Sequence, residues 1–310
     1  MQQPALAQWL EQRLQRSLRR WQPIGGGCIH NAWQLELLDG SCLFAKTNRA
    51  ELLPVLQAEA DGLTALGTAA AAARDNVLQI PEPLACERVE DQAVLVMEWL
   101  ELGRPQHGNS HQAWLDLGRG LAQLHRSSCD NADGRYGWQR DNFIGSSPQP
   151  NGWRRSWASF FCEQRLGAQL AMAEAKGHHL GEAIELLEAV PRWLAHHQPE
   201  PCLVHGDLWS GNAGLLSDGG CALFDPAVYR GDREVDLAMA RLFGGFPVAF
   251  FEGYQQEWPL PAGHQQRLEL YNLYHLLNHA NLFGGGYWQQ CAASIKAINR
   301  GIPCAGSEPW

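Results

Sequence analysis

Three polar residues in the second half of the chain have the types and the spacing that phosphoryl transfer requires. Asp207 is followed five positions later by Asn212, and Asp225 ends a short apolar stretch thirteen residues after that. A carboxylate such as Asp207 can accept the proton of an attacking hydroxyl, and amide and carboxylate oxygens are ligands that Mg²⁺ prefers beside phosphate. Each residue alone also fits a turn, because Gly-Asp and Asp-Pro are common turn sequences. Their order and spacing together predict a catalytic base and two magnesium ligands.

The spacing D-x-x-x-x-N is also that of a kinase catalytic loop, which works with a lysine and a glutamate from earlier in the chain. Lys46 lies in the otherwise apolar stretch Phe44-Ala45-Lys46, and Glu59 follows thirteen residues later in a predicted helix. A charge inside such a strand calls for a partner, so we predict a Lys46–Glu59 ion pair that aims the ammonium at the phosphates of ATP. The alternative is an exposed strand face with a solvated glutamate.

Two further segments lie where a kinase holds its nucleotide. A glycine strap between the first two predicted strands would let backbone N–H groups approach phosphate oxygens, although it is not a G-x-G-x-x-G motif. A second segment ends the last strand of the first hundred residues, where adenine would meet the backbone. The strap consists of Gly25, Gly26, Gly27 and Cys28, and the adenine segment consists of Glu98, Trp99 and Leu100.

Residues beside the predicted base are candidates for contact with the acceptor. His205 and Trp209 lie two residues on either side of Asp207. We expect both to face the substrate, with the Trp209 indole packed on a sugar or on its amine-bearing chain. The alternative for Trp209 is packing between two lobes. Asp236 either braces the catalytic loop or is only a carboxylate at a helix N-terminus.

The predicted elements that position these residues change character near residue 100. Residues 20–100 read as β-β-β-α-β-β, with Asp39-Gly40 as a hairpin turn and a helix over 53–66 that Gly67 would cap. A leucine stripe predicts another helix over 5–18, and the alanine-rich stretch 69–73 fits either a helix or a loop. Beyond residue 100, helices are expected over 111–125, 157–175, 181–197, 234–243, 247–257, 264–283 and 287–299, with a long structured loop over 130–155.

Composition narrows the class of protein. The chain has 310 residues, 45% of them hydrophobic, and 24 basic against 33 acidic residues give a net charge of −9. An acidic globular chain without a basic tract is a poor candidate for binding nucleic acid or anionic membranes. Nine cysteines without a CxxC pair favour reduced thiols over a zinc or disulfide scaffold. The N-terminal segment lacks the apolar core of a signal peptide, so a cytoplasmic location is expected.

The chain resembles the fructosamine kinase, or ketosamine-3-kinase, family, which is related to aminoglycoside and choline kinases. The segments that carry the resemblance are GGGCIHNAW, FAKTN, DNFIGSSPQPN, HGDLWSGN, FDPAVYRGDREVDLAMARLFGGFP and LYHLLNHANLFGGGY. The resemblance implies an α+β, bilobal, protein-kinase-like fold. A small β-rich N-terminal lobe with one helix, residues 1–100, would bind nucleotide. A larger, mainly helical lobe, residues 101–310, would hold the catalytic and substrate-binding groups.

The resemblance also implies an activity and roles for the motif residues. It implies that ATP and Mg²⁺ serve to phosphorylate the 3-hydroxyl of a ketosamine, on a free amine or a glycated protein lysine, which leads to deglycation. Asp207 would be the base, Asn212 and Asp225 the magnesium ligands, and Lys46 the phosphate contact. The sequence departs from protein kinases in having His-Gly-Asp for His-Arg-Asp, Asp-Pro-Ala for Asp-Phe-Gly, and no Ala-Pro-Glu segment. Control by activation-loop phosphorylation is therefore not expected.

Other functions and one form of regulation remain to be weighed. The alternatives are another small-molecule kinase of the aminoglycoside or choline type, and a catalytically silent nucleotide-binding regulator. Similar kinases carry a cysteine in the strap, where a cationic setting favours the thiolate. This suggests a redox-dependent homodimer through a Cys28–Cys28 disulfide, against an inert residue in a crowded loop.

Overall fold

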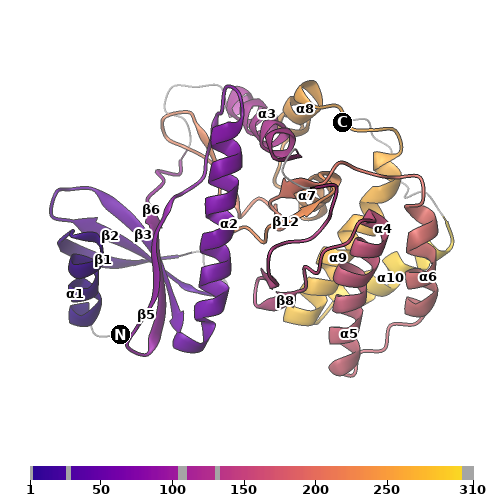
Figure 1. Cartoon of the computed structure of the whole chain (residues 1–310), viewed down its shortest axis with the longest axis horizontal. Coiled ribbons are helices and arrows are strands. Elements are labelled where there is room, and N and C mark those ends of the chain that lie inside the picture. Colours follow the sequence, from indigo (N-terminus) through magenta and orange to yellow (C-terminus); the bar gives the residue numbers. More distant parts are fainter. Residues whose placement is uncertain (1–2, 26–28, 104–109, 130–132, 302–310) are drawn as a thin grey trace.

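The first hundred residues form a five-stranded antiparallel sheet that lies beside a mainly helical part (Figure 1). The computed structural model describes residues 3–25, 29–103, 110–129 and 133–301. The strand order is β1-β2-β3-β6-β5. The strands are β1 (Leu18–Ile24), β2 (Asn31–Leu37), β3 (Cys42–Arg49), β5 (Pro83–Val89) and β6 (Gln92–Glu98). The predicted strands over 32–38, 42–47 and 93–100 agree with β2, β3 and β6 within two residues, and Asp39-Gly40 makes the turn between β2 and β3.

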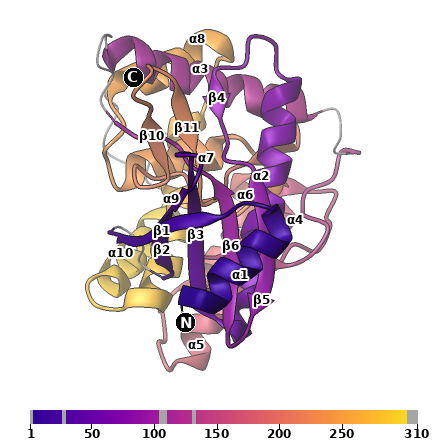
Figure 2. The same cartoon turned by 90° about the vertical axis from the view of Figure 1, so that its left-hand side faces the viewer.

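A helix covers each face of this sheet. Helix α1 (Gln3–Leu14) packs through Leu6 and Leu10 on the face that is turned toward the viewer in Figure 2. Helix α2 (Leu53–Ala72) packs on the opposite face, between the sheet and the helical part in Figure 1. Strand β6 is buried on both faces, and its side chains alternate between them: Val94 and Val96 lie in the cluster with α1, and Ala93, Leu95 and Met97 lie in the cluster with α2. The resemblance implied one helix for this part of the chain. That expectation was wrong, because α1 and α2 both belong to it.

Two expected helix ends differ from the structure. The helix predicted over 5–18 ends at Leu14, because Leu18 begins β1 and pairs with Leu37 of β2. Helix α2 does not stop at Gly67 but continues to Ala72, so the alanine-rich stretch extends it. Alanine has the highest helix propensity, and the four alanines from 69 to 72 outweigh Gly67. A longer α2 carries the chain to the helical part.

The helical part contains nine helical segments in the residues described. They are α3 (Ser110–Ser128), α4 (Trp157–Phe160), the π-helix η3 (Phe161–Gly167), α5 (Ala168–Ala175), α6 (Ala183–Trp193), α7 (Glu234–Leu242), α8 (Val248–Glu257), α9 (His264–Phe283) and α10 (Tyr287–Asn299). The last two have the predicted bounds, and α4, η3 and α5 follow one another over the predicted 157–175. Buried aromatic rings, among them Trp157 and Tyr271, hold this part together. Among the residues described, no helix is long and apolar enough to cross a membrane.

Short strands in this part carry the polar motifs. The segment expected as a loop over 130–155 contains a hairpin of β7 (Asn142–Ile144) and β8 (Ser147–Gln149). The other strands are β9 (Cys202–Val204), β10 (Ala213–Leu215), β11 (Cys221–Leu223) and β12 (Tyr229–Gly231). Strand β4 (Leu78–Gln79) precedes residue 100 but pairs in parallel with β11, so it belongs to the sheet of the C-terminal part. A domain boundary at residue 100 stays a prediction.

Candidate active site

A cavity of about 570 Å³ lies between the sheet and the short strands of the helical part. Its walls contain most of the residues singled out from the sequence. Those that line it are Gly25, Lys46, Glu59, Glu98, Trp99, Leu100, Asp207, Trp209, Asn212 and Asp225. Gly26, Gly27 and Cys28 lie outside the described residues, so the strap and the disulfide dimer stay predictions. The structure thus gathers motifs that are up to two hundred residues apart in the chain.

Lys46 joins the two parts of the molecule. Its Nζ donates to Glu59 Oε1 of α2 at 2.7 Å, and it also bonds to the Asp225 carboxylate, which follows β11. Burial alone would lower the pKa of Lys46, but the two carboxylates together raise it above its ordinary value. The ammonium therefore stays charged at the floor of the cavity, and the expected Lys46–Glu59 pair is present.

The catalytic loop holds Asp207 and Asn212 against each other. Asn212 Nδ2 donates to the Asp207 backbone carbonyl at 2.9 Å and to Asp207 Oδ2 at 3.2 Å. Asn212 Nδ2 also lies 3.3 Å from the backbone carbonyl oxygen of Asp225. Burial, followed by the charge of Asp225, raises the pKa of Asp207 to about 7, although the Asn212 bond opposes this shift. A carboxyl group with such a pKa can exchange a proton near neutral pH.

The donor set beside Asp207 fits a magnesium ion. Because the Asn212 amide nitrogen is used in bonds to Asp207, its Oδ1 is left to face a cation. Asp225 supplies carboxylate oxygens from a residue with φ of +58°, a left-handed conformation that Asp tolerates better than most residues. Mg²⁺ is usually held by one or two such oxygens together with phosphate and water. Asn212 and Asp225 are therefore the residues that would hold it.

Asp236 on α7 braces the catalytic loop from behind. Its carboxylate accepts the backbone N–H groups of His205 at 2.7 Å and Gly206 at 2.8 Å, and it pairs with His125 Nε2 of α3 at 3.0 Å. Burial by itself would raise the pKa of Asp236, but the His125 partner lowers it below its ordinary value. The sequence allowed Asp236 to be either a brace of this loop or only a carboxylate at a helix N-terminus. The structure favours the brace.

Gly206 explains the departure from His-Arg-Asp. Its φ is +80°, and a Cβ at this position would come 2.1 Å from the backbone oxygen of Ala227. A side chain here would therefore meet backbone that cannot move aside. The close approach brings the Asp225–Ala227 segment against the catalytic loop, where the Ala227 N–H donates to the His205 carbonyl at 2.8 Å.

His205 does not fit the expected substrate contact. The residue is fully buried and does not line the cavity. Its Nε2 lies 3.0 Å from the Phe224 carbonyl, and its Nδ1 accepts the Asp207 N–H at 3.3 Å. Burial lowers the pKa of the ring, in keeping with a neutral tautomer that donates through Nε2. His205 thus positions Asp207 through the backbone, and the sequence alone could not show that both ring nitrogens have backbone partners.

Trp209 lines the cavity two residues beyond Asp207. Its indole packs on Gly211, where a Cβ would come 2.2 Å from the ring. The ring is partly exposed and lies on the cavity wall. Substrate contact by Trp209 stays a prediction.

Two features of the site were missed by reasoning from the sequence. In the hairpin, Asn142 Nδ2 donates to the Val228 carbonyl at 2.7 Å and Gln149 Nε2 donates to the Ala227 carbonyl at 3.0 Å, so two buried amides fix the chain just after Asp225. His30 lines the cavity, and burial and the charge of Lys46 lower its pKa to about 4. A signal for the hairpin was available, because Asn and Gln side chains recur in this segment, which is rich in Gly, Pro and Ser.

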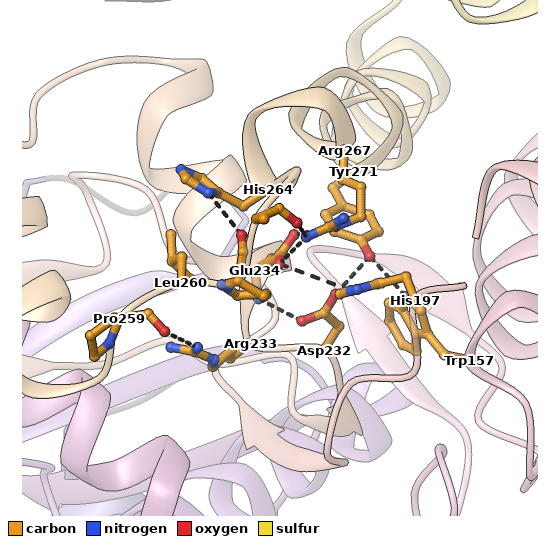
Figure 3. Close-up of polar contacts among 12 residues, drawn as sticks. Trp157, His197, Asp232, Arg233, Glu234, Pro259, Leu260, His264, Arg267 and Tyr271 are labelled. Carbon is orange, nitrogen blue, oxygen red and sulfur yellow. Dashed lines mark hydrogen bonds and ion pairs between the residues drawn. The ribbon is translucent and has the colours of Figure 1, made fainter. Parts of the chain in front are cut away.

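A second polar cluster lies at the start of α7 and is not part of the cavity (Figure 3). His197, Asp232 and Glu234 bring ligand-type atoms within 4.8 Å of one another, the one such group of three among the residues described. Arg267 already forms two bonds of 2.7 Å to Glu234, and Asp232 accepts bonds of 2.6 Å from both His197 and Tyr271. The ligand-type atoms of the cluster are already hydrogen-bonded to one another, to Arg267 and to Tyr271, so we interpret the cluster as an anchor of α7 and thereby of Asp236.

Comparison with known proteins agrees with this site. Residues 1–300 match the fructosamine kinase family. A protein named "probable ketoamine kinase" from Synechocystis sp. is 46% identical over 278 residues, which cover 89% of each chain. The crystal structure of a protein assigned as a fructosamine-3-kinase, from Haemophilus somnus 129PT, has a TM-score of 0.83 at 28% identity and covers 94% of this chain and 96% of that one.

The kinase-like fold extends to more distant proteins. A ternary complex of aminoglycoside phosphotransferase APH(4)-Ia with AMP-PNP and hygromycin B has a TM-score of 0.63 at 17% identity and covers 96% of this chain and 98% of that one. At this identity the likeness shows the fold alone, and the bound analogue supports nucleotide use by the fold. The match along nearly the whole length and the relative at 46% identity establish that the chain belongs to the fructosamine kinase family.

Proposed function

We propose that this protein transfers the γ-phosphoryl group of ATP to the 3-hydroxyl of a ketosamine. The observation that carries the proposal is the arrangement of Asp207, Asn212 and Asp225 around the buried Lys46 ammonium in a single cavity. This set provides a base, two magnesium ligands and a phosphate contact, which are the parts that phosphoryl transfer needs. The named relatives support a ketoamine as the acceptor.

Each residue has a role that follows from its contacts. Asp207 accepts the proton of the acceptor hydroxyl, and Asn212 holds that carboxylate in place. Lys46, fixed by Glu59, offers its charge to the phosphates, while the backbone at Glu98 to Leu100 faces the adenine. Mg²⁺ bound with ATP would neutralise charge on the transferred group. Asp236 and His205 hold the loop in position by accepting hydrogen bonds from its backbone N–H groups.

The product suggests a physiological purpose. A phosphate on C3 lies next to the C2 carbonyl of the ketosamine, and such a 3-phosphate decomposes and frees the amine. The acceptor would be a glycated small amine or a glycated lysine of a protein. Repeated over many acceptors, the reaction would amount to deglycation.

The test is ATP turnover by the purified protein with Mg²⁺ and a matched panel of fructosamines and ribulosamines. We expect ADP formation that depends on the ketosamine, and NMR of the product with phosphorus coupled to C3. The Asp207→Asn variant serves as the inactive control. Turnover on aminoglycosides or choline but not on any ketosamine would favour the other kinase types. Nucleotide binding without turnover on any acceptor would instead indicate a silent regulator.

A further inference from the structure

The imidazole ring of His30 lines the cavity, and none of the roles given above uses it. His30 immediately precedes β2, and its side chain is partly buried. The charges of both the Lys46 ammonium and the Asp225 carboxylate act on the pKa of this ring. The ring therefore lies near the two groups that are expected to meet the phosphates of ATP and the metal ion.

Asn48 of β3 determines which nitrogen of this ring carries the proton. The Asn48 Oδ1 accepts the Arg49 N–H at 2.8 Å, and the Asn48 Nδ2 donates to the Ile29 carbonyl at 2.9 Å. These two backbone partners fix the direction of the amide. The same Nδ2 lies 2.9 Å from His30 Nδ1. Because an amide nitrogen can only donate, His30 Nδ1 must be the unprotonated acceptor.

The proton of the neutral ring is therefore on Nε2. Burial, and after it the charge of Lys46, lower the pKa of His30 to about 4, so the ring is neutral near pH 7. Within the described residues, Nε2 has no hydrogen-bond partner. The ring thus offers the cavity one N–H donor in a fixed tautomer, because Asn48 occupies its other nitrogen. A donor that is held in place in this way suits an oxygen on which negative charge develops.

The residue before His30 reaches across the cavity to the C-terminal part of the molecule. A Cβ at Gly145, in the turn between β7 and β8, would lie 3.1 Å from the Ile29 side chain. Gly145 and Ile29 both line the cavity. The hairpin of β7 and β8 also binds the chain just after Asp225. These contacts place His30 toward the end of the cavity where the γ-phosphate would meet the acceptor, rather than beside the adenine segment.

We propose that His30 Nε2 donates a hydrogen bond to the γ-phosphoryl group while that group passes from ATP to the acceptor. This inference rests on the proposed function, because it takes the transfer to occur between Lys46 and Asp207. In the transfer, the bond from the γ-phosphorus to the ADP oxygen breaks, a bond to the acceptor oxygen forms, and the acceptor proton goes to Asp207. His30 Nε2 keeps its proton throughout. The donor stabilises the negative charge that the three equatorial oxygens carry in the transition state.

The first test separates the γ-phosphoryl group from the rest of the nucleotide. His30→Asn leaves no donor at the place of Nε2, whereas His30→Gln can put an amide nitrogen there. We expect His30→Asn to lower kcat on a fructosamine about 10²-fold, the usual loss for one such donor. It should weaken the binding of AMP-PNP and leave the Kd for ADP unchanged, since ADP lacks the γ-phosphate. His30→Gln should recover most of both losses, and His179→Asn, at an exposed histidine, is the matched control.

The second test moves the ring proton without replacing His30. Asn48→Asp puts a carboxylate, which can only accept, beside Nδ1, so the proton of the neutral ring should move to Nδ1. NMR of the ring nitrogens in the nucleotide-free protein identifies the tautomer. We expect Nε2–H in the wild type and Nδ1–H in Asn48→Asp. At a pH where the ring is neutral, kcat of Asn48→Asp should fall toward that of His30→Asn.

Three results would overturn the proposal. They are a wild-type ring that is protonated on Nδ1, a normal kcat in His30→Asn, and equal losses of ADP and AMP-PNP binding in that variant, which would indicate a merely structural role. The binding comparison needs no acceptor. A wild-type protein that is inactive on every ketosamine, while His30→Asn still weakens AMP-PNP but not ADP, would instead overturn the proposed function.

Discussion

Lys46 of β3 and Glu59 of α2 form an ion pair of 2.7 Å although their side chains are only 8% and 10% exposed. Two charges at this depth are stable only while each has a partner, because an unpaired buried charge costs several kcal/mol. Lys46 has a further partner in Asp225, but Asp225 is also the carboxylate expected to bind Mg²⁺. Glu59 thus keeps the lysine charged without engaging the metal ligand.

The Glu59→Gln variant tests this division of partners. We expect the Lys46 ammonium to draw closer to Asp225, so that kcat/KM for ATP falls about tenfold or more and the free energy of unfolding falls by about 3 kcal/mol. Steady-state kinetics and urea unfolding measure the two effects. Glu51→Gln, an exposed acid just before α2, is the control. An unchanged kcat/KM for ATP would show that Glu59 does not support the phosphate contact.

The Asp207→Asn variant tests the base. An amide cannot accept the proton of the acceptor hydroxyl, and general-base catalysis contributes about 10² to 10⁴ in rate. We expect kcat on any ketosamine to fall by at least that range, while the affinity for nucleotide stays near that of the wild type. Asp218→Asn, in an exposed turn before β11, should leave both unchanged. Turnover close to wild type in Asp207→Asn would rule out this residue as the base.

Gly206→Ala separates a steric clash from backbone strain. Gly206 and Gly219 both have positive φ, +80° and +95°, but only at Gly206 would a Cβ meet backbone, 2.1 Å from the Ala227 oxygen. We expect Gly219→Ala to cost about 1 kcal/mol of stability with normal kcat. Gly206→Ala should abolish most activity and lower the melting temperature further. Equal effects from the two substitutions would mean that the contact with Ala227 is unimportant.

His275 makes stability depend on pH. Burial, and then the neighbouring His279, lower its pKa from 6.5 to about 3, and its Nδ1 is buried without a partner. The folded state therefore binds fewer protons than the unfolded state between about pH 3 and 6.5. In that window stability rises with pH, and the contribution is complete above pH 6.5.

The expected result is a flatter pH profile in His275→Gln. Urea unfolding between pH 5 and 7.5 should show the slope reduced by up to about 1.4 kcal/mol per pH unit relative to the wild type. His179→Gln, which replaces an exposed histidine, should keep the wild-type slope. If His275→Gln also keeps that slope, the ring is protonated in the folded state.

The parts of the site that the sequence predicts are those set by short-range spacing. Asp207 and Asn212 lie in one loop, so five residues of sequence fix their relation. Lys46 and Glu59 are thirteen residues apart, and a strand followed by a helix on the same face of the sheet brings them together.

The parts that escaped prediction depend on contacts between distant segments. The bond from Gln149 to the Ala227 carbonyl spans 78 residues, and Lys46 and Asp225 are 179 residues apart. The short strand β4 exists only because β11 lies beside it. Helix α2 is the exception, since it continues past Gly67 through local helix propensity. His205 was misassigned because only the fold shows that both of its nitrogens face backbone.

Strand β4 has a consequence for how the molecule can be divided. The backbone passes from the sheet part to the C-terminal part at the end of α2, returns after β4, and crosses again after β6. The two parts are thus joined by three lengths of backbone rather than by one. A fragment that began at residue 101 would also lack β4 and leave an edge of β11 open to strand addition by another chain. A cut ahead of β4 would keep that edge covered, but it would take β5 and β6 away from β3 and open the edge of β3 instead, so the two parts do not separate cleanly at either point.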